Sequence, residues 1–286
     1  MYIYINGRII KEEEALISIF DHGFMYGLGL FETFRVYQGH AFLFNDHMER
    51  LREGLTELDI RWNVTNEEIL DAVNDLLVKN NLKDAYIRLN VSAGPSSLGL
   101  PMETYEAPTT IIYIKSIPQL ANKKEGVFLE TLRNTPEGRY RLKSHHYLNN
   151  ILGKREIGQA SDKEGIFLTK EGFLAEGIVS NLFWVKDRVV YTPHIDTGIL
   201  NGITRRFVQK LLNKKGIKVE EGFYMKEDIL SSDEVFATNS IQEIFSITHI
   251  GSQSYEPTTN AIAELLQKEY RHYTSFLATM NQMEDK

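Results

Sequence analysis

Alternating apolar and polar residues at the start of the chain predict a β-hairpin. Asn6-Gly7 lies between two such stretches, and this pair is favoured in two-residue hairpin turns because both turn positions need a positive φ. A second hairpin is predicted around Gln38-Gly39. β-branched and aromatic residues indicate the other strands, and the strands and hairpin-like stretches predicted along the chain cover residues 2–5, 8–10, 31–37, 41–44, 86–91, 109–117, 165–175, 181–191 and 234–237.

Apolar residues three or four positions apart predict amphipathic helices. Met48, Leu51 and Leu55 share one face of a helix for which Asn45 is the expected N-cap, because a short polar side chain can accept from the first free N–H groups. The other predicted helices cover residues 67–78, 144–160, 203–216 and 260–278.

These elements predict an α+β protein with two domains. Residues 118–126 are polar and contain proline and glycine, a composition typical of domain boundaries. We expect an N-terminal α+β domain over residues 1–118 and a C-terminal domain over 127–286, joined by a linker at about 119–126. The length of 286 residues agrees with this division, since domains average about 150 residues.

Composition and charge exclude several classes of protein. The chain is 42% hydrophobic and 25% charged, which is ordinary for a globular protein. Its net charge of -7 offers no basic field for nucleic acid or anionic lipid. The chain contains no cysteine, so disulfides, thiolate metal sites and cysteine nucleophiles are ruled out. A basic-then-apolar leader and an apolar stretch of bilayer length are both missing, and we expect a cytoplasmic protein with no membrane partner.

Lys143 is the first candidate for chemistry, in the segment RLKSHHYLNN. A lysine is usually solvated, so a surface position is the simpler interpretation. A functional lysine would need a pocket that lowers its pKa, where the neutral amine can form a Schiff base and move protons. The neighbouring Arg141 and two histidines could supply such a field, but spacing alone leaves both interpretations open.

Glu176-Gly177 is the second candidate, between two strand-like stretches. A glutamate at a turn is normally solvated. A buried carboxylate opposite a heterocyclic nitrogen would instead keep that nitrogen protonated, as a pyridinium electron sink requires. Asn181 would serve to fix the loop.

Gly202, Ile203 and Thr204 begin a predicted helix, where free N–H groups and the helix dipole favour an anion. Simple helix capping is the alternative. The polar run that contains Asn239 and Ser240 is either a turn or a cradle of hydroxyl and amide groups for phosphate.

Other chemistry has no support in the sequence. Histidines and carboxylates do not recur at metal-ligand spacing, so we expect no metal site. The glycine-rich phosphate loops and the G-x-S-x-G nucleophile motif do not occur. Nucleotide and nucleic-acid binding are therefore not indicated.

The candidates follow one another in a fixed order along the chain: residues 27–33 (GLGLFET), 47–51 (HMERL), Lys143, 176–183 (EGIVSNLF) and 202–205 (GITR). This series resembles the class IV aminotransferase family of pyridoxal-phosphate enzymes across almost the whole chain. The resemblance implies the two-domain fold type IV, with a smaller N-terminal and a larger C-terminal domain, the cofactor in the interdomain cleft, and a homodimer.

The resemblance also implies roles for individual residues. Lys143 would be the Schiff-base lysine and catalytic residue, and Glu176 the partner of the pyridine nitrogen. Tyr147 would contact the ring hydroxyl of pyridoxal 5'-phosphate. The remaining residues implied to bind the cofactor share its phosphate group: Arg50, Ile203, Thr204, Asn239 and Ser240.

Within the family, RNTP at 133–136 followed by RLKSHHYLNN most resembles the lyase branch, which converts 4-amino-4-deoxychorismate to p-aminobenzoate and pyruvate. Ser180 stands where the resembling segment of branched-chain aminotransferases has a second glutamate, and Ala93 stands where D-amino-acid aminotransferases carry arginine. Both departures favour the lyase. Arg88 resembles a position near the substrate of branched-chain enzymes, so transamination of branched-chain or D-amino acids stays the alternative.

Overall fold

The computed structural model describes residues 1–117, 119, 121–255 and 261–283, and contacts within the chain divide these residues into two compact units. Unit 1 comprises residues 1–117, 143–146 and 274–283, and unit 2 comprises the remainder. The predicted division at residues 1–118 and 127–286 differs in two places, because residues 143–146 and 274–283 group with the N-terminal part of the chain.

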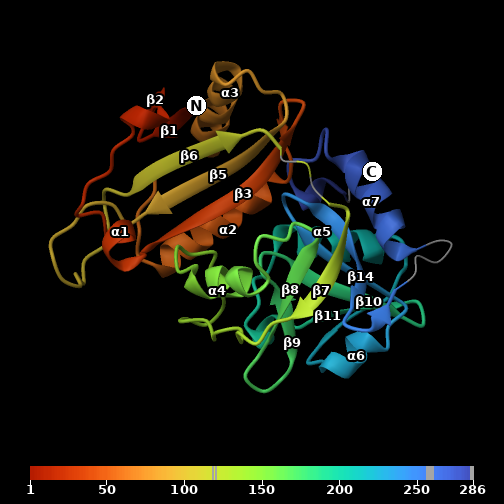
Figure 1. Ribbon diagram of the computed structural model, residues 1–286. Coiled ribbons are helices and arrows are strands. Elements are labelled where there is room, and N and C mark those ends of the chain that lie inside the picture. Colours follow the sequence, from red (N-terminus) through yellow and green to blue (C-terminus); the bar gives the residue numbers. More distant parts are fainter. Residues whose placement is uncertain (118, 120, 256–260, 284–286) are drawn as a thin grey trace. The chain divides into compact units, whose positions relative to one another are not determined.

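Unit 1 contains an antiparallel sheet with strand order β2-β1-β6-β5-β3-β4. Figure 1 shows β6, β5 and β3 side by side. The strands are β1 (Tyr2–Ile5), β2 (Arg8–Lys11), β3 (Gly29–Tyr37), β4 (His40–Ala41), β5 (Ala85–Ser92) and β6 (Thr109–Lys115). The helices of this unit are η1 (Glu12–Glu14), α1 (His22–Tyr26), α2 (Phe44–Glu57), α3 (Asn66–Lys79) and η3 (Met280–Met283).

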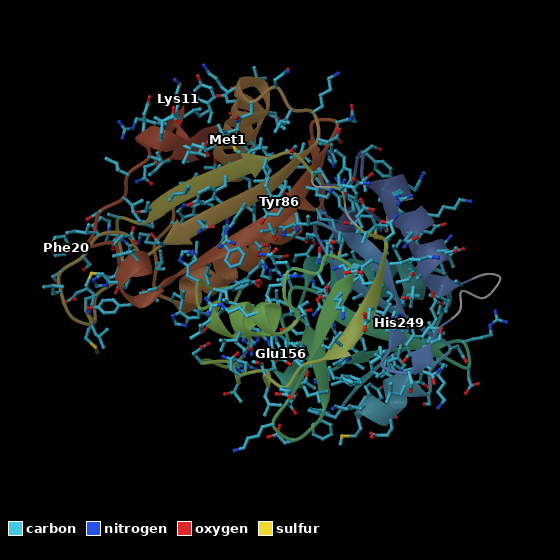
Figure 2. All side chains as sticks on the ribbon, in the orientation of Figure 1. Met1, Lys11, Phe20, Tyr86, Glu156 and His249 are labelled. Atoms are coloured by element: carbon cyan, nitrogen blue, oxygen red, sulfur yellow. The ribbon has the colours of Figure 1, made fainter. Side chains whose placement is uncertain are left out.

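The two faces of this sheet differ in polarity. Ile87, Leu89 and Val91 alternate along β5 and are fully buried, as period-two patterning requires for a core-facing row. Helix α3 buries its own apolar face and is fixed at its start by a capping box between Thr65 and Glu68. The opposite row of β5 begins at Tyr86, which is labelled in Figure 2, and is only partly buried.

Unit 2 contains a mixed sheet with strand order β12-β11-β10-β13-β14-β7-β8-β9, and β15 pairs with β14. Its strands are β7 (Lys123–Phe128), β8 (Lys163–Leu168), β9 (Leu174–Gly177), β10 (Asn181–Lys186), β11 (Val189–Pro193), β12 (Val219–Gly222), β13 (Glu234–Asn239), β14 (Glu243–Ile250) and β15 (Gln253–Ser254). Its helices are α4 (Leu148–Glu156), η2 (Ile195–Thr197), α5 (Ile203–Lys214), α6 (Lys226–Leu230) and α7 (Ile262–Tyr273). Phe183 and Phe236 stack in its core with centroids 5.1 Å apart.

The observed elements confirm the α+β prediction and both predicted hairpin turns, but three local predictions are wrong. The strand expected at residues 41–44 ends at Ala41, because Leu43 adopts a left-handed conformation (φ 51°) and starts α2 as its N-cap. Asn45 therefore lies inside the helix and does not cap it. The helix expected at 144–160 begins only at Leu148, because Ser144 forms a β-bridge with Leu30.

Long-range pairing explains the other differences. Half of the predicted linker is strand β7, which lies between β14 and β8 and is parallel to both. Its partners are distant in sequence, so its polar composition does not reveal them. The helix expected at 260–278 ends at Tyr273, while residue 260 lies outside the described residues.

A buried ion pair ties β7 to β8 in unit 2. Lys124 Nζ lies 2.9 Å from Glu164 Oε2 and 2.9 Å from Gln242 Oε1. Glu164 Oε1 accepts from Ser180 Oγ at 2.8 Å. Both charged side chains are almost fully buried, so each depends on the other for compensation of its charge.

We expect Lys124→Met to destabilise unit 2 by about 3–5 kcal/mol, because the substitution leaves the Glu164 carboxylate buried without its cation. Glu164→Gln in the same chain should recover part of this loss. Urea unfolding followed by the fluorescence of Trp184, which lies in the core of unit 2, measures the change. Lys163→Met removes a partly exposed pair with Glu125 and should cost less than about 1 kcal/mol. Equal losses for the two lysines would contradict the assignment.

Candidate active site

Residues 143–146 form a short extended segment that pairs with the start of β3 in unit 1. The N–H of Phe31 donates to the carbonyl of Lys143 at 2.9 Å, and the N–H of His145 donates to the carbonyl of Gly29 at 3.0 Å. Side chains alternate along an extended chain, so Lys143 and His145 share one face. The pairing thus fixes the direction of the Lys143 side chain within unit 1.

Three polar side chains of this face lie against the ring of Phe31. Its ring centroid lies 3.7 Å from the Arg88 guanidinium carbon and 4.5 Å from Lys143 Nζ. The His145 ring stacks on it at 6.4 Å. The face of an aromatic ring attracts cations, so Phe31 brings together two predicted site residues, Lys143 and Arg88.

His145 is held beside this group by hydrogen bonds. Arg88 Nε donates to Asn90 Oδ1 at 2.8 Å, and Asn90 Nδ2 lies 3.3 Å from His145 Nε2. Burial, reinforced by the charge of Arg88, lowers the pKa of His145 to about 4. The imidazole is therefore neutral at neutral pH.

Arg50 lies in α2 and binds Glu32 of β3. Its Nε and Nη2 donate to the two carboxylate oxygens at 2.7 Å each, and His47 Nδ1 lies 2.7 Å from Oε2. Burial alone would raise the pKa of Glu32, but Arg50 and His47 lower it to about 2. Glu32 and Phe31 are adjacent in β3 and point to opposite faces, so Arg50 is not grouped with Lys143 in unit 1.

Glu176, at the end of β9, is the centre of a buried polar cluster in unit 2. Its Oε1 accepts from Arg133 Nε at 2.9 Å and from Arg133 Nη2 at 2.8 Å. Its Oε2 accepts from the backbone N–H of Leu200 at 3.0 Å and from Asn181 Nδ2 at 3.4 Å. The solvated turn considered from the sequence is wrong, because Glu176 is only 4% exposed.

A second arginine lies close to this carboxylate. Arg141 Nε is 3.9 Å from Glu176 Oε1. Burial, together with the neighbouring Arg133, lowers the pKa of Arg141 to about 10, so that it keeps its charge at neutral pH. Tyr147 is the N-cap of α4, and its phenol interacts electrostatically with Arg141. Tyr147 and Glu176 thus belong to the same part of unit 2.

The start of α5 forms a polar cradle in the same unit. Gly202 is its N-cap and provides no side-chain hydrogen bond to the first turn. Thr204 Oγ1 and Ser240 Oγ meet at 3.3 Å, so two of the predicted residues come together. The Cβ of any other residue at position 202 would lie 2.1 Å from Asn181 Oδ1. Hydroxyl groups beside an uncapped helix start favour an anion.

Asn239 has a different role in the structure. Its Oδ1 accepts from the N–H groups of Ile241 and Gln242 at 2.9 and 2.7 Å, which closes the turn between β13 and β14. This is the structural role that the sequence left open. Ile203 is buried at the first position of α5, where its backbone N–H is available to an anion.

Sequence reasoning missed three polar residues of these clusters as site residues: Arg133, Asn90 and His145. Asn90 and His145 each follow a predicted site residue by two positions, so a period-two strand pattern could have placed them on the same face. The partnership of Arg133 with Glu176 spans 43 residues and has no local signal. Among the described residues, no three His, Asp or Glu side chains are grouped to hold a metal ion, and no helix has the length and apolarity to span a membrane.

Comparison with known proteins gives consistent relatives. Residues 29–250 match the model of the family described as amino-transferase class IV. The chain is 48% identical to the aminodeoxychorismate lyase of Bacillus subtilis, over 94% of this chain and 95% of that protein. It is 30% identical to the D-alanine aminotransferase of Bacillus licheniformis, over 93% and 96% of the two chains.

The solved structures agree with this assignment. The branched-chain amino acid aminotransferase of Escherichia coli matches with a TM-score of 0.85 and 27% identity, over 97% of this chain and 95% of that chain. The predicted fold of type IV is therefore confirmed at the level of architecture. The chain belongs to the class IV aminotransferase family.

Proposed function

We propose that this chain is an aminodeoxychorismate lyase, which uses pyridoxal 5'-phosphate to convert 4-amino-4-deoxychorismate to p-aminobenzoate and pyruvate. The observation that carries the proposal is the 48% identity with the Bacillus subtilis lyase along nearly the whole of both chains. The aminotransferases compared above are only about 30% identical. A route that produces p-aminobenzoate in this way supplies folate synthesis.

The cradle at α5 has the chemistry that a phosphate group needs. The uncapped first turn supplies backbone N–H donors, and the hydroxyls of Thr204 and Ser240 supply two more. The buried Thr238 hydroxyl has no hydrogen-bond partner among the described residues. We propose that Ile203, Thr204 and Ser240 bind the cofactor phosphate, with Arg50 adding a positive charge and Asn239 shaping the turn.

The Glu176 cluster has the chemistry that a pyridine nitrogen needs. Its carboxylate is buried and paired with Arg133, so a negative charge is held where water is scarce. A carboxylate has about four acceptor positions, and Glu176 accepts four bonds, of which the 3.4 Å bond from Asn181 is the longest. An incoming donor would displace this longest bond first. We propose that Glu176 accepts from the cofactor nitrogen and that Tyr147 binds the ring hydroxyl.

Lys143 is the proposed catalytic residue. Its Nζ is the amine that would hold the cofactor covalently. When bound, the cofactor supplies an electron sink for the charge left on the substrate carbon. In its free, neutral form the Lys143 amine would take the proton from the ring carbon that bears the substrate amine, which is general base catalysis.

The same lysine completes the elimination. Its ammonium gives the proton to the methylene carbon of the enolpyruvyl group as the bond between the ring and the ether oxygen breaks. Pyruvate leaves with three carbons, and the aromatic p-aminobenzoate keeps seven, so the ten carbons and all protons of the substrate are accounted for. Arg88, on the same face as Lys143, is proposed to bind a substrate carboxylate.

We also propose a homodimer in the cytoplasm. Three large apolar side chains between β5 and β6 of unit 1 are strongly exposed: Leu98 at 74%, Leu100 at 82% and Met102 at 95%. Such a concentration of apolar surface favours contact with another protein, and a second copy of the chain is the partner proposed here.

The proposed reaction predicts both products without an added oxo acid. Purified protein loaded with pyridoxal 5'-phosphate should convert 4-amino-4-deoxychorismate to equal amounts of p-aminobenzoate and pyruvate, measured by chromatography. Incubation with D-alanine or branched-chain amino acids alone should leave the cofactor spectrum unchanged. Efficient conversion of the cofactor to its amine form by one of these amino acids, with no p-aminobenzoate formed, would instead identify a transaminase.

Lys143→Ala should abolish turnover by several orders of magnitude, because covalent attachment and proton transfer depend on the same Nζ. The phosphate cradle does not involve Lys143, so the variant should still bind the cofactor. Borohydride treatment followed by peptide mass spectrometry should find the cofactor on Lys143 of the unmodified protein and nowhere in the variant. Lys170→Ala, at an exposed turn, is the matched control. Near-normal turnover of Lys143→Ala would refute the assignment.

Glu176→Gln should lower turnover more than about a hundredfold while the cofactor stays bound. One charge-assisted hydrogen bond is worth about 1.5–3 kcal/mol, which accounts for roughly ten- to hundredfold, and loss of the protonated nitrogen adds to this. Turnover is compared at full cofactor loading, measured by absorbance. Glu164→Gln changes another buried glutamate of unit 2 and should affect stability more than turnover. A change of only a few-fold for Glu176→Gln would remove this residue from the site.

A further inference from the structure

The hydrogen bonds around Asn90 have only one consistent direction. Arg88 Nε can only donate, so the atom that faces it must be the carbonyl oxygen of Asn90. The amide nitrogen of Asn90 then faces His145 Nε2 and can only donate to it. His145 Nε2 must therefore be the acceptor, which leaves the ring proton on Nδ1.

Other contacts of His145 agree with this tautomer. The backbone of Leu30 acts on the imidazole in the direction that raises its pKa, against the larger effect of burial, as a carbonyl facing a ring N–H does. The lowered pKa keeps the ring neutral, so that Nε2 retains its lone pair. The side chains thus form one directed series, in which Arg88 donates to Asn90 and Asn90 donates to His145.

The absence of a side chain at Gly29 leaves room for the His145 ring. A Cβ at position 29 would lie 2.6 Å from His145 Cε1 and 2.7 Å from the Val91 carbonyl oxygen. Any other residue would push the imidazole away from Asn90. The glycine of the sequence motif therefore serves the placement of His145.

The series leaves most of the Arg88 guanidinium available. Among the described residues, the bond to Asn90 is the only hydrogen bond that this guanidinium makes. Arg88 also lines a pocket of about 570 Å³ on the same face of the sheet, with Tyr86 and Tyr113 among its other lining residues. Arginine presents its two terminal nitrogens to a carboxylate as a fork. In Arg88 only Nε donates to Asn90, so both terminal nitrogens remain unpaired within the described part of the chain.

We propose that His145 and Asn90 are positioning residues that hold the Arg88 guanidinium in the orientation that binds a carboxylate of the substrate. The inference rests on the proposed lyase function, because it assigns one of the substrate's two carboxylates to Arg88. His145 acts through Asn90 and Arg88 and need not touch the substrate. Its neutral Nδ1–H tautomer is essential, since a protonated ring could not accept from Asn90.

His145→Phe tests the series, because phenylalanine can keep the stacking on Phe31 but cannot accept from Asn90. Calorimetry on the cofactor-loaded protein would measure binding of both products, p-aminobenzoate and pyruvate, and of 4-aminobenzamide, which has no carboxylate. We expect about tenfold weaker binding of at least one carboxylate, unchanged binding of the amide, and a raised KM with kcat changed less. Asn90→Ala should give the same pattern.

Two controls separate this role from simple destabilisation. His249→Phe makes the same substitution at a partly exposed histidine of unit 2, labelled in Figure 2, and should bind all three compounds normally. In an Arg88→Lys background, His145→Phe should add almost no further loss. Nitrogen-15 NMR of the unmodified protein should show the His145 ring proton on Nδ1.

Unchanged binding of both carboxylates by His145→Phe, equal loss of the amide, or a ring protonated on Nε2 would each overturn the inference. These measurements do not need turnover. A protein that binds carboxylates in this pattern but forms no p-aminobenzoate would disprove the lyase function and leave the positioning role intact.

Discussion

The pairing of residues 143–146 with the edge of β3 is the interaction on which the chemistry of unit 1 depends. Two backbone hydrogen bonds, at 2.9 and 3.0 Å, join a segment from the middle of the chain to a strand about 115 residues earlier. Because side chains alternate along an extended segment, this pairing places Lys143 and His145 over Phe31. A helix at the same residues would have turned the two side chains in different directions.

Two cations of unit 1 are arranged by one aromatic ring. Arg88 and Lys143 both lie over Phe31, and mutual repulsion is offset by their attraction to the ring face. The neutral His145 completes the group without adding charge. Under the proposed function, an acidic substrate on this face would meet two cations and an uncharged hydrogen-bonding series, a combination that suits recognition of a carboxylate beside the Lys143 amine.

Unit 2 uses buried pairs to hold its polar groups. Arg133 fixes Glu176 through two hydrogen bonds, while Lys124 and Glu164 fix Ser180 and Gln242 at the adjoining turns. Each charge has a partner, as burial requires. The Glu176 turn and the Asn239 turn are thus held by side chains that are far apart in sequence, so we expect a single substitution in these pairs to affect more than one loop.

The sequence by itself determined the α+β class, both hairpin turns, the α5 start at Gly202 and the order of motifs that identifies the family, because these depend on local dihedral preference, periodicity or motif spacing. It did not determine that residues 143–146 are extended, that β7 lies inside the expected linker, or that Arg133 pairs with Glu176. The tertiary structure decided these features, since each depends on partners more than 15 residues away. The composition of a local segment does not indicate which distant residues it will contact.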